Sequence, residues 1–465
     1  MIEEITATEK SVRREPRSIS SLSVAGFKSI SQEQSIEIKP LTILAGANSS
    51  GKSSIIQPLL LLKQTLEATY NPGPLKIDGP NIKFDAFDQF LSVNNKAAHV
   101  TDFAVSIGIS KETVITTCFS KLPDKPLEVQ KTEYQIDETK FSFRKEMSPE
   151  EIFEMMPSTF KEQYQKSELL REANLKIERV HSFLRPVLRD KSDEPVLFFT
   201  EAVAFLGMLD SELMFLERRS QELIHIPGVR GLPARFFPQT VVGPTFPGTF
   251  EVYTGSVIWE WQQNEPTKIQ DLQRDLANLQ LGTSEIQARK IGDIQIEVLV
   301  SRLPSSSGSN GSKNGSKNKK HDMVSLADVG LGVSHTLSVL VALQAARPGQ
   351  LVYIEQPEIH LHPKAQVAMA QILANAATRG VRVVVETHSE LMLLAVQTLI
   401  AEGKLSPNLV KLHWFERDKG GVTKITPANL DEDGAFGEWP QDFGSTVLQI
   451  QKEYLDAVSR RYYLE

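Results

Sequence analysis

The sequence predicts an α/β fold with a parallel core sheet, and three segments support this prediction. Residues 41–45 form a short apolar run typical of a buried strand, and an apolar helix follows from Ser54. Residues 46–53 between them read GANSSGKS, a full match to the pattern GxxxxGK[ST]. Two later apolar runs, 350–354 and 381–385, end in polar residues, as strands do at the ligand-binding edge of a parallel sheet.

The GANSSGKS segment has the residues that hold an oligophosphate. Its glycines let the backbone bend so that N–H groups face the negative oxygens, and the dipole of the following helix favours the same charge. Lys52 is expected to neutralise the β- and γ-phosphates, and Ser53 to ligate Mg²⁺. The predicted nucleotide-binding residues here are Gly46, Ala47, Asn48, Ser49, Ser50, Gly51, Lys52, Ser53 and Ser54. The sequence therefore predicts binding of a nucleoside triphosphate.

The composition is that of an ordinary globular protein, with 40% hydrophobic and 23% charged residues over 465 positions. The net charge of −7 gives no overall attraction to nucleic acid, so such a contact would need a local basic patch. Cys118 is the single cysteine, which excludes a disulfide framework and suits a reducing cytosol. No stretch reaches the ~18 apolar residues of a membrane span, and the N-terminus lacks a secretory signal. We therefore expect a cytoplasmic protein without membrane contact.

Changes in composition divide the chain into seven expected segments. These are a flexible N-terminal arm (1–20), an N-terminal lobe with the phosphate loop (21–145), a helical insertion (146–230), a mixed segment returning to the core (231–303), a disordered Gly/Ser/Asn/Lys loop (304–322), a C-terminal lobe (323–445) and a C-terminal helix (446–465). We expect helix in the insertion to about residue 180 and again over 201–224. The second helix carries the apolar stripe Phe205, Met208, Leu209, Leu213 and Leu216. Internal packing is its expected use, and a partner-binding face is the alternative.

The C-terminal lobe contributes three further candidate features. The strand 350–354 ends in Glu355-Gln356-Pro357-Glu358, the layout in which a carboxylate at a strand end holds the Mg²⁺ shell and a neighbour polarises the attacking water. The glycine turn 328–334 precedes an apolar helix, 336–345, and so forms another anion site. The strand 381–385 leads to His388. Each feature alone is weak, but their order along the chain is informative.

This order resembles that of ATP-binding-cassette-type ATPases. The strings GANSSGKSS, LADVGLGVSHTL, IEQPEIHLHP and VVVETHSELMLL are similar to those of ATPases related to the RecF, SMC and overcoming-lysogenization-defect proteins. The resemblance covers about 21–145 and 320–445, and the segment 414–440 resembles a C-terminal extension of prokaryotic members of uncertain function. It implies an ABC-type P-loop NTPase of the AAA family with a mixed N-terminal sheet, a parallel core sheet and an inserted helical region.

The resemblance also implies residue roles. ATP and Mg²⁺ are the implied cofactors, with Ser53, Glu355 and Gln89 near the metal, and His388 is the implied switch histidine. A second copy of the chain would supply the signature turn to the γ-phosphate, through Gly330, Gly332 and Ser334. The protein is therefore expected to form a dimer or higher oligomer with shared ATP sites.

One position departs from the pattern of these ATPases. They carry Asp and then Glu at the strand end, whereas this chain has Glu355-Gln356. A carboxamide has no titratable proton and cannot act as a base. Either Glu358 replaces it, or hydrolysis is slow and the chain works as a nucleotide-gated clamp, which is the favoured expectation. His360 and His362 have a spacing that suits zinc, but no further ligand is nearby in the sequence.

The sequence alone is compatible with three functions. The favoured one is an ATPase of prokaryotic anti-phage defence, resembling the Septu and retron-associated type, that regulates a separate effector such as a nuclease. Only 77 residues (465 − 388) follow His388, which leaves no room for a Toprim nuclease domain, and no HNH cluster is present. The alternatives are a RecF-like DNA-repair clamp, with direct nucleic-acid contact possible, and a transporter ATPase.

Overall fold

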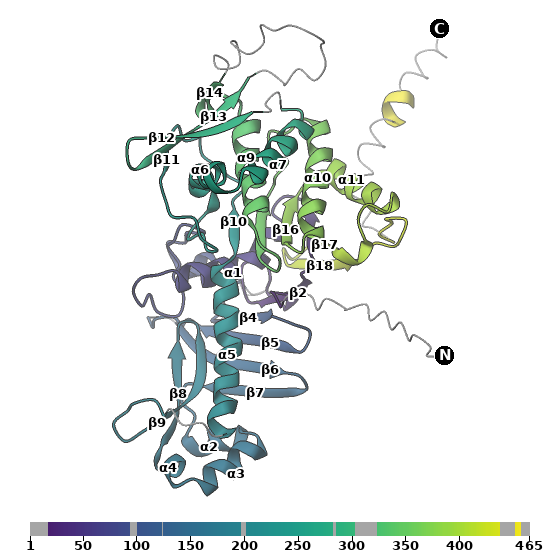
Figure 1. The fold of residues 1–465 in the computed structure, drawn as a ribbon. Coiled ribbons are helices and arrows are strands. Elements are labelled where there is room, and N and C mark those ends of the chain that lie inside the picture. The colour runs from purple at the N-terminus through teal and green to yellow at the C-terminus, as the bar shows by residue number, and fades with distance from the viewer. Residues whose placement is uncertain are drawn as a thin grey trace, which may run out of the picture.

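A computed structural model describes residues 17–93, 100–122, 124–196, 201–281, 285–302, 323–437 and 452–456. The molecule is elongated, with a head of sheet and packed helices at one end and an arm at the other (Figure 1). The long helix α5 (Glu201–Gln221) runs along the arm towards the head. Among the helices of these described residues, none has the length and apolar character needed to cross a membrane.

The head is built on a six-stranded sheet whose strands come from distant parts of the chain. Its order is β10-β15-β16-β3-β17-β18, with only the last pair antiparallel. The strands are β3 (Leu41–Gly46), β10 (Ile224–Ile226), β15 (Leu351–Glu355), β16 (Arg382–Thr387), β17 (Val410–Arg417) and β18 (Thr423–Ala428). The four strands β10, β15, β16 and β3 are apolar on both faces, which is the pattern of a covered parallel sheet.

Helices cover both faces of this sheet. One face packs on α1 (Lys52–Leu66) and the N-terminal sheet. The other face packs on α9 (Leu331–Ala345) and α10 (Pro363–Thr378). The helices α6 (Thr254–Asn264), α7 (Pro266–Asn278) and α11 (Glu390–Ala401) belong to the same apolar core. Side chains of one strand alternate between the two cores: Tyr353 points to the first and Ile354 to the second. The predicted α/β fold with a parallel core sheet is confirmed.

The N-terminal lobe adds a second six-stranded sheet, in the order β2-β1-β4-β5-β6-β7, and every pairing in it is antiparallel. Its strands are β1 (Ser21–Ala25), β2 (Gln34–Glu37), β4 (Asp102–Gly108), β5 (Thr113–Ser120), β6 (Glu128–Ile136) and β7 (Thr139–Arg144). Ser18 and Ile19 are buried beside it, so this lobe begins before the predicted boundary at residue 21.

The insertion is less helical than the sequence suggested. It contains α2 (Pro149–Met155), α3 (Ser158–Lys166), α4 (Glu168–Glu172), the hairpin strands β8 (Asn174–Val180) and β9 (Phe183–Arg189), and then α5. A capping box formed by Ser148 and Glu151 begins α2, but the chain forms a strand from residue 174, where helix was expected. The end of the predicted insertion is also wrong, because β10 already belongs to the core sheet.

The apolar stripe of α5 serves mainly for internal packing. Leu209, Leu213 and Leu216 are buried, and α5 packs on α1 and α3, whereas Met208 is exposed. A small sheet over the head contains β11 (Phe237–Pro238), β12 (Ile286–Ile291), β13 (Gln295–Ser301) and β14 (Met323–Ser325). The predicted loop at 304–322 lies outside the described residues, as does most of the predicted C-terminal helix, of which 452–456 is described and helical.

Candidate nucleotide-binding site

The phosphate loop joins β3 to α1 at the edge where the parallel strands end. Gly46 has a φ of +143°, and a side chain there would lie 2.2 Å from the carbonyl oxygen of Phe415. Gly51 precedes the helix with a φ of +103°, and a side chain there would meet the hydroxyl of Thr423 at 2.3 Å. Both glycines are therefore required by backbone shape and by space. The Thr423 hydroxyl also donates to the Ser50 carbonyl at 2.8 Å, which fastens the loop to β18.

Lys52 folds over this loop. Its Nζ donates to the carbonyl oxygens of Gly46 at 3.0 Å and Ala47 at 2.8 Å. Burial lowers the pKa of Lys52, and the nearby carboxylates of Glu386 and Glu358 oppose that shift. An ammonium group held over a glycine-rich loop at the start of a helix is placed to meet a polyphosphate.

Glu386, at the end of β16, is the carboxylate that contacts Ser53. The Ser53 hydroxyl donates to Glu386 Oε2 at 2.9 Å, and the Tyr353 hydroxyl donates to Oε1. Burial raises the pKa of Glu386 to about 7, with a further contribution from the charge of Glu355. A hydroxyl and a carboxylate oxygen side by side are the ligand types that Mg²⁺ takes in phosphate-loop proteins.

Glu355 lies one strand farther from the phosphate loop than expected. It pairs in register with Glu386 across β15 and β16. Its two carboxylate oxygens contact His225 Nε2 at 3.3 Å and the N–H group of Gly228 at 2.9 Å. Burial alone would raise the pKa of Glu355, but these hydrogen bonds outweigh it and the pKa is lowered. Ser53 therefore contacts Glu386 and not Glu355, because β16 lies between β3 and β15. The metal-binding role of Glu355 stays a prediction.

Gln356 and Glu358 follow in a tight turn. Gln356 has a φ of +45°, and its N–H donates to the carbonyl of Glu386 at 2.8 Å, so the turn is fixed to β16. Glu358 Oε1 accepts the N–H of His388 at 2.7 Å, while its buried Oε2 has no hydrogen-bond partner within the described part of the chain. Burial raises the pKa of Glu358, against the opposing effect of the His388 N–H. The Thr387 side chain also lowers the pKa of Glu358, and the Glu358 carboxylate lies close enough to Lys52 to act on the charge of that side chain.

His388 lies beside the loop, as the strand-end position predicted. Burial and the charge of Lys52 lower its pKa, and a backbone hydrogen bond to Gly46 works in the opposite direction. The ring is therefore neutral at pH 7. The structure thus brings together Lys52, Ser53, Glu358, Glu386 and His388, of which Glu386 was not predicted. Its signal was the position next to Thr387-His388 at the end of an apolar strand.

Gln89 lies elsewhere. It ends a short 3-10 turn (Phe87–Gln89), is exposed, and accepts the N–H of Asp85 at 2.9 Å. No contact between Gln89 and Ser53 occurs among the contacts found in the described residues, so its predicted role near the metal has no geometric support.

The signature residues lie at the start of α9. Gly330 caps the helix, and Gly332 faces the backbone of His360, where a side chain would lie 2.9 Å from the carbonyl oxygen. The Ser334 hydroxyl donates to the Leu331 carbonyl at 3.2 Å. None of these three residues bonds to the phosphate loop of the same chain, within the described ranges.

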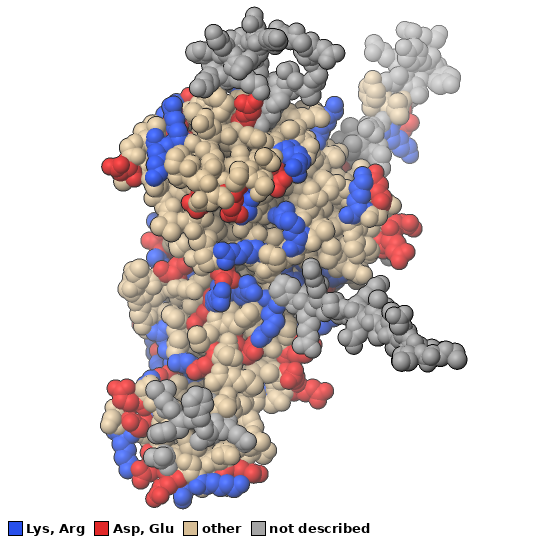
Figure 2. Space-filling model, viewed as in Figure 1, with Lys and Arg blue, Asp and Glu red and all other residues tan. Residues whose placement is uncertain are grey.

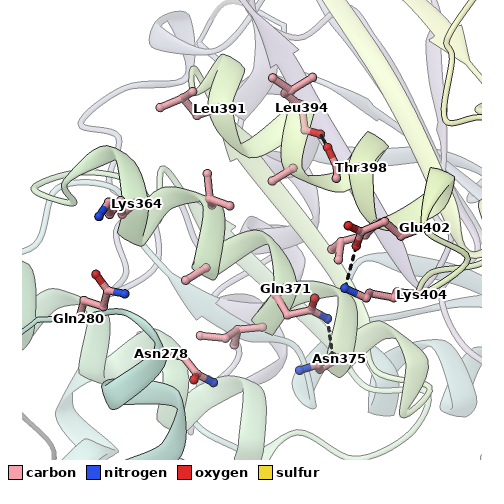
Figure 3. A pocket seen from close by; sticks show the side chains of 15 residues that line it. Asn278, Gln280, Lys364, Gln371, Asn375, Leu391, Leu394, Thr398, Glu402 and Lys404 are labelled. Carbon is pink, nitrogen blue, oxygen red and sulfur yellow. Dashed lines mark hydrogen bonds and ion pairs between the residues drawn. The ribbon is translucent and has the colours of Figure 1, made fainter.

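Two of the pockets on the described part of the head bear on the candidate site. One, of about 480 Å³, includes Ser334 in its wall. The other, of about 780 Å³, is a groove between α7, α10 and α11 that no phosphate-loop residue lines (Figure 3). Lys404 and Glu402 pair at 2.7 Å on its rim.

No group of three or more metal-ligating side chains occurs in the described residues, so His360 and His362 gain no zinc partner. On the face drawn in Figure 2, basic and acidic residues are interspersed over head and arm.

The chain was compared with known protein families, curated sequences and solved structures. Residues 41–395 match the family described as "AAA domain, putative AbiEii toxin, Type IV TA system". No curated protein sequence matches the chain significantly.

Solved structures of SMC heads are similar to the chain at low identity. An SMC head bound to the C-terminal winged-helix domain of ScpA is 12% identical and covers 89% of this chain and 98% of its own, with a TM-score of 0.46. The SMC head domain from Thermotoga maritima is 11% identical, covers 89% and 100%, and has a TM-score of 0.38. An SMC head with an extended coiled coil, bound to a ScpA domain derived from Pyrococcus furiosus, is 12% identical, covers 94% and 100%, and has a TM-score of 0.40.

Proposed function

Since the chain belongs to this AAA-domain family, we propose that it binds Mg²⁺·ATP at the loop 46–53 and hydrolyses it. The observation that carries this proposal is the contact of Ser53 with Glu386 beside the Lys52 ammonium. A hydroxyl and a carboxylate thus lie side by side, next to a cation, which is the set of groups that a triphosphate and its metal require.

Each residue of the site has a separate role in this proposal. Bound Mg²⁺ would neutralise developing charge on the phosphates, and Ser53 and Glu386 are the residues that would hold it. Lys52 exchanges its loop carbonyls for phosphate oxygens. The neutral His388 ring, adjacent to Gly46, orients groups around the γ-phosphate.

Glu358 is the general base in this proposal. Its free Oε2 accepts the proton of the attacking water, and its raised pKa makes it a stronger base than an exposed carboxylate. Gln356 has no proton to exchange, and its backbone is tied to β16. Glu358 thus takes over from Gln356. Slow turnover in the absence of a partner remains a prediction for this chain.

Nucleotide binding is tested by substituting Lys52. Lys52→Ala should weaken ATP binding by at least about a hundredfold, since it removes a buried charge-assisted contact to phosphate. Lys404→Ala, on the rim of the groove in Figure 3, is the matched control and should bind like the wild type. Calorimetric titration with ATP makes the comparison. Equal, tight binding by Lys52→Ala and wild type would refute the assignment.

We further propose that ATP joins two copies of the chain and that the assembly controls a separate effector, such as a nuclease, in prokaryotic anti-phage defence. The signature turn supports the first part, because within the described residues it makes no contact with its own phosphate loop. The family description, with its toxin and Type IV toxin–antitoxin system, is in keeping with the second. Sedimentation with and without ATP tests the dimer, and a strict monomer in every nucleotide state would contradict it.

The alternative function is that of a RecF-like DNA-repair clamp without an effector. The net charge of −7 and the mixed charges in Figure 2 give it no support. Co-purification from the native host discriminates the two: a nuclease retained with the wild type and lost with Lys52→Ala favours defence. ATP-dependent binding of duplex DNA by the purified chain alone would favour the clamp.

A further inference from the structure

The 480 Å³ pocket beside the signature turn combines buried polar groups with an exposed apolar rim. Arg230, Ser334 and His335 lie in its wall. The rim is formed by large apolar side chains that remain exposed in the single chain, Val229, Leu232, Phe236 and Val252. Leu232 is 88% exposed and Val229 94%. Contiguous exposed apolar surface around a polar centre is typical of a surface that a protein partner covers.

Arg230 is held in place but has donor capacity left over. Its Nε donates to the Pro227 carbonyl at 2.9 Å, and its Nη2 donates to the Glu355 carbonyl at 2.9 Å, at the end of β15. Its Nη1 is buried and has no hydrogen-bond partner in the described chain. Burying a guanidinium N–H without an acceptor is costly, which indicates that an acceptor from outside this chain completes the site.

His335 has a free ring nitrogen in the same pocket. The residue is 7% exposed, its Nε2 lies 3.1 Å from the Gly231 carbonyl, and its Nδ1 has no partner among the described residues. Burial lowers its pKa, so the ring is neutral, carries its proton on Nε2 and offers Nδ1 as an acceptor. Two buried polar atoms in the wall of the pocket, one donor and one acceptor, thus lack a partner within the described chain. A nucleotide, with phosphate oxygens and ribose hydroxyls, supplies a partner for each.

We propose that Arg230 acts in trans: its free Nη1 binds a phosphate oxygen of the ATP held by a second copy of the chain, whose surface covers the rim Val229, Leu232, Phe236 and Val252. This inference rests on the proposed function. No residue of the loop 46–53 lines the pocket, so a phosphate received there comes from another molecule. Ser334, one residue before His335, lies in the same wall and ties the pocket to the signature turn.

Glu251 also lines this pocket, and its charge acts on Arg230 together with those of Glu355 and Glu358. These carboxylates keep the guanidinium in place before nucleotide arrives. Because Arg230 also bonds to the end of β15, the same side chain joins the Glu355–Glu358 turn of its own chain to the partner's nucleotide.

The first experiment separates action in cis from action in trans. ATP affinity is measured on dilute, monomeric protein, and ATP-driven dimerisation is measured by sedimentation, for wild type, Arg230→Gln and Arg230→Lys. Arg230→Gln should bind ATP within about twofold of the wild type while its dimer weakens at least about tenfold, the cost of one charge-assisted hydrogen bond. Arg230→Lys should recover part of the loss. A weakened monomer affinity, or an unchanged dimer, would overturn the proposal.

Leu232→Asp provides a variant with an intact fold, since the Leu232 side chain is almost fully exposed. It should leave monomer ATP affinity unchanged and weaken the ATP-driven dimer. Exposed Val367, in the groove of Figure 3, supplies the matched control Val367→Asp, which should dimerise like the wild type. If Leu232→Asp dimerises normally, the second copy does not cover this rim.

Mixed dimers provide the second experiment. Differently tagged Lys52→Ala and Arg230→Gln chains are mixed with ATP and compared with Lys52→Ala mixed with wild type. Mixed dimers that carry both tags are isolated before the assay, because either mixture also contains homodimers. In trans, each mixed dimer retains one complete site of two, so both should turn over ATP equally, at about half the rate of the wild-type dimer. In cis, only the pair with wild type retains a complete site, and loss of activity in the other pair would refute the proposal.

A free phosphate ion could bind Arg230 in the same way as the phosphate of a partner's ATP. Inorganic phosphate titrated into Lys52→Ala protein should not bind measurably at millimolar concentration. Phosphate binding that disappears in Lys52→Ala/Arg230→Gln would assign the pocket to a free anion instead. If wild type neither binds ATP nor assembles with it, the proposed function itself fails, which is a different result from each of these.

Discussion

The Ser53 hydroxyl donates a 2.9 Å hydrogen bond to Oε2 of Glu386, although 333 positions separate the two residues. This contact joins the start of α1 to the end of β16, which lies directly beside β3 in the sheet. It identifies Glu386, and not Glu355, as the carboxylate nearest to the hydroxyl that would ligate Mg²⁺.

Glu386→Gln should therefore impair use of Mg²⁺ more than Glu355→Gln does. We expect the Mg²⁺ concentration for half-maximal ATP hydrolysis to rise about 10–100-fold for Glu386→Gln, the usual range for loss of a ligand-shell group. Glu355→Gln should give a smaller rise, because the carboxylate of Glu355 is occupied by His225 and Gly228. Hydrolysis assays over a Mg²⁺ series measure both, and the reverse ranking would restore Glu355 as the metal ligand.

Stability should depend on the ionisation of Glu386. Its pKa rises from 4.5 in the unfolded chain to about 7 in the fold, so the folded protein binds the extra proton between these values. The free energy of unfolding consequently falls as pH rises from 4.5 to 7. The Glu386→Gln variant has no carboxyl group here to titrate, so it does not lose this stability. Its free energy of unfolding, relative to that of the wild type, should therefore increase by on the order of 3 kcal/mol between pH 5 and pH 8.

Urea denaturation in EDTA at the two pH values makes this measurement. His413, whose pKa burial lowers to about 4, titrates in both proteins and cancels in the difference. A difference that does not change with pH would show that Glu386 stays ionised throughout.

Glu358→Gln should reduce the catalytic rate about 10²–10⁴-fold, the contribution of a general base. Gln356→Glu should change the rate by less than about threefold, since a base is already present. Because the base must be ionised and its pKa is raised, the wild-type rate should increase with pH through a value above 4.5. Single-turnover hydrolysis measures all three. If Gln356→Glu accelerates the reaction strongly while Glu358→Gln has no effect, the chain is a slow clamp that lacks a base.

Lys63→Met should destabilise the fold by about 3–5 kcal/mol, the cost of breaking a buried ion pair. Lys63 is fully buried in α1, pairs with Glu67, and donates to the carbonyls of Gln221 at 3.2 Å and Phe246 at 3.1 Å. It thus joins the phosphate-loop helix to the end of α5 and to the head.

Lys166→Met is the matched control for this variant. Lys166 forms an ion pair of the same i,i+4 spacing with Glu162, but its side chain is 74% exposed, so the change should be within about 0.5 kcal/mol. Denaturant unfolding compares the two variants. Equal effects would show that Lys63 has no special structural role.

Much of the nucleotide site was predictable because its chemistry is local. The sequence of 46–53 dictates a glycine-dependent turn, and the apolar runs on either side dictate strand and helix; the structure places Gly46 and Gly51 at positive φ as that turn requires. The strand end with His388 was equally local. The apolar runs 41–45, 350–354 and 381–385 likewise indicated β3, β15 and β16.

The insertion could not be read in the same way. The charged stretch from 149 to 180 has helical spacing, yet Asn174–Val180 forms a strand because Phe183–Arg189 pairs with it as a hairpin. Pairing with a second strand outweighs a weak helix propensity, and the sequence of one segment does not indicate which strand it will pair with.

By itself, the sequence determined that this chain has a phosphate-binding loop, a parallel core sheet, acidic and histidine-bearing strand ends, and one cysteine. Strand order, and with it the neighbour of Ser53, was decided only by the tertiary structure: inserting β16 between β3 and β15 brings Glu386 to the hydroxyl and moves Glu355 to His225. The same holds for Arg230, whose unpaired Nη1 exists only because a loop after β10 folds against the signature helix. Local patterns specify which chemistry is present, whereas the distances that decide which groups act together arise from contacts between segments far apart in the chain.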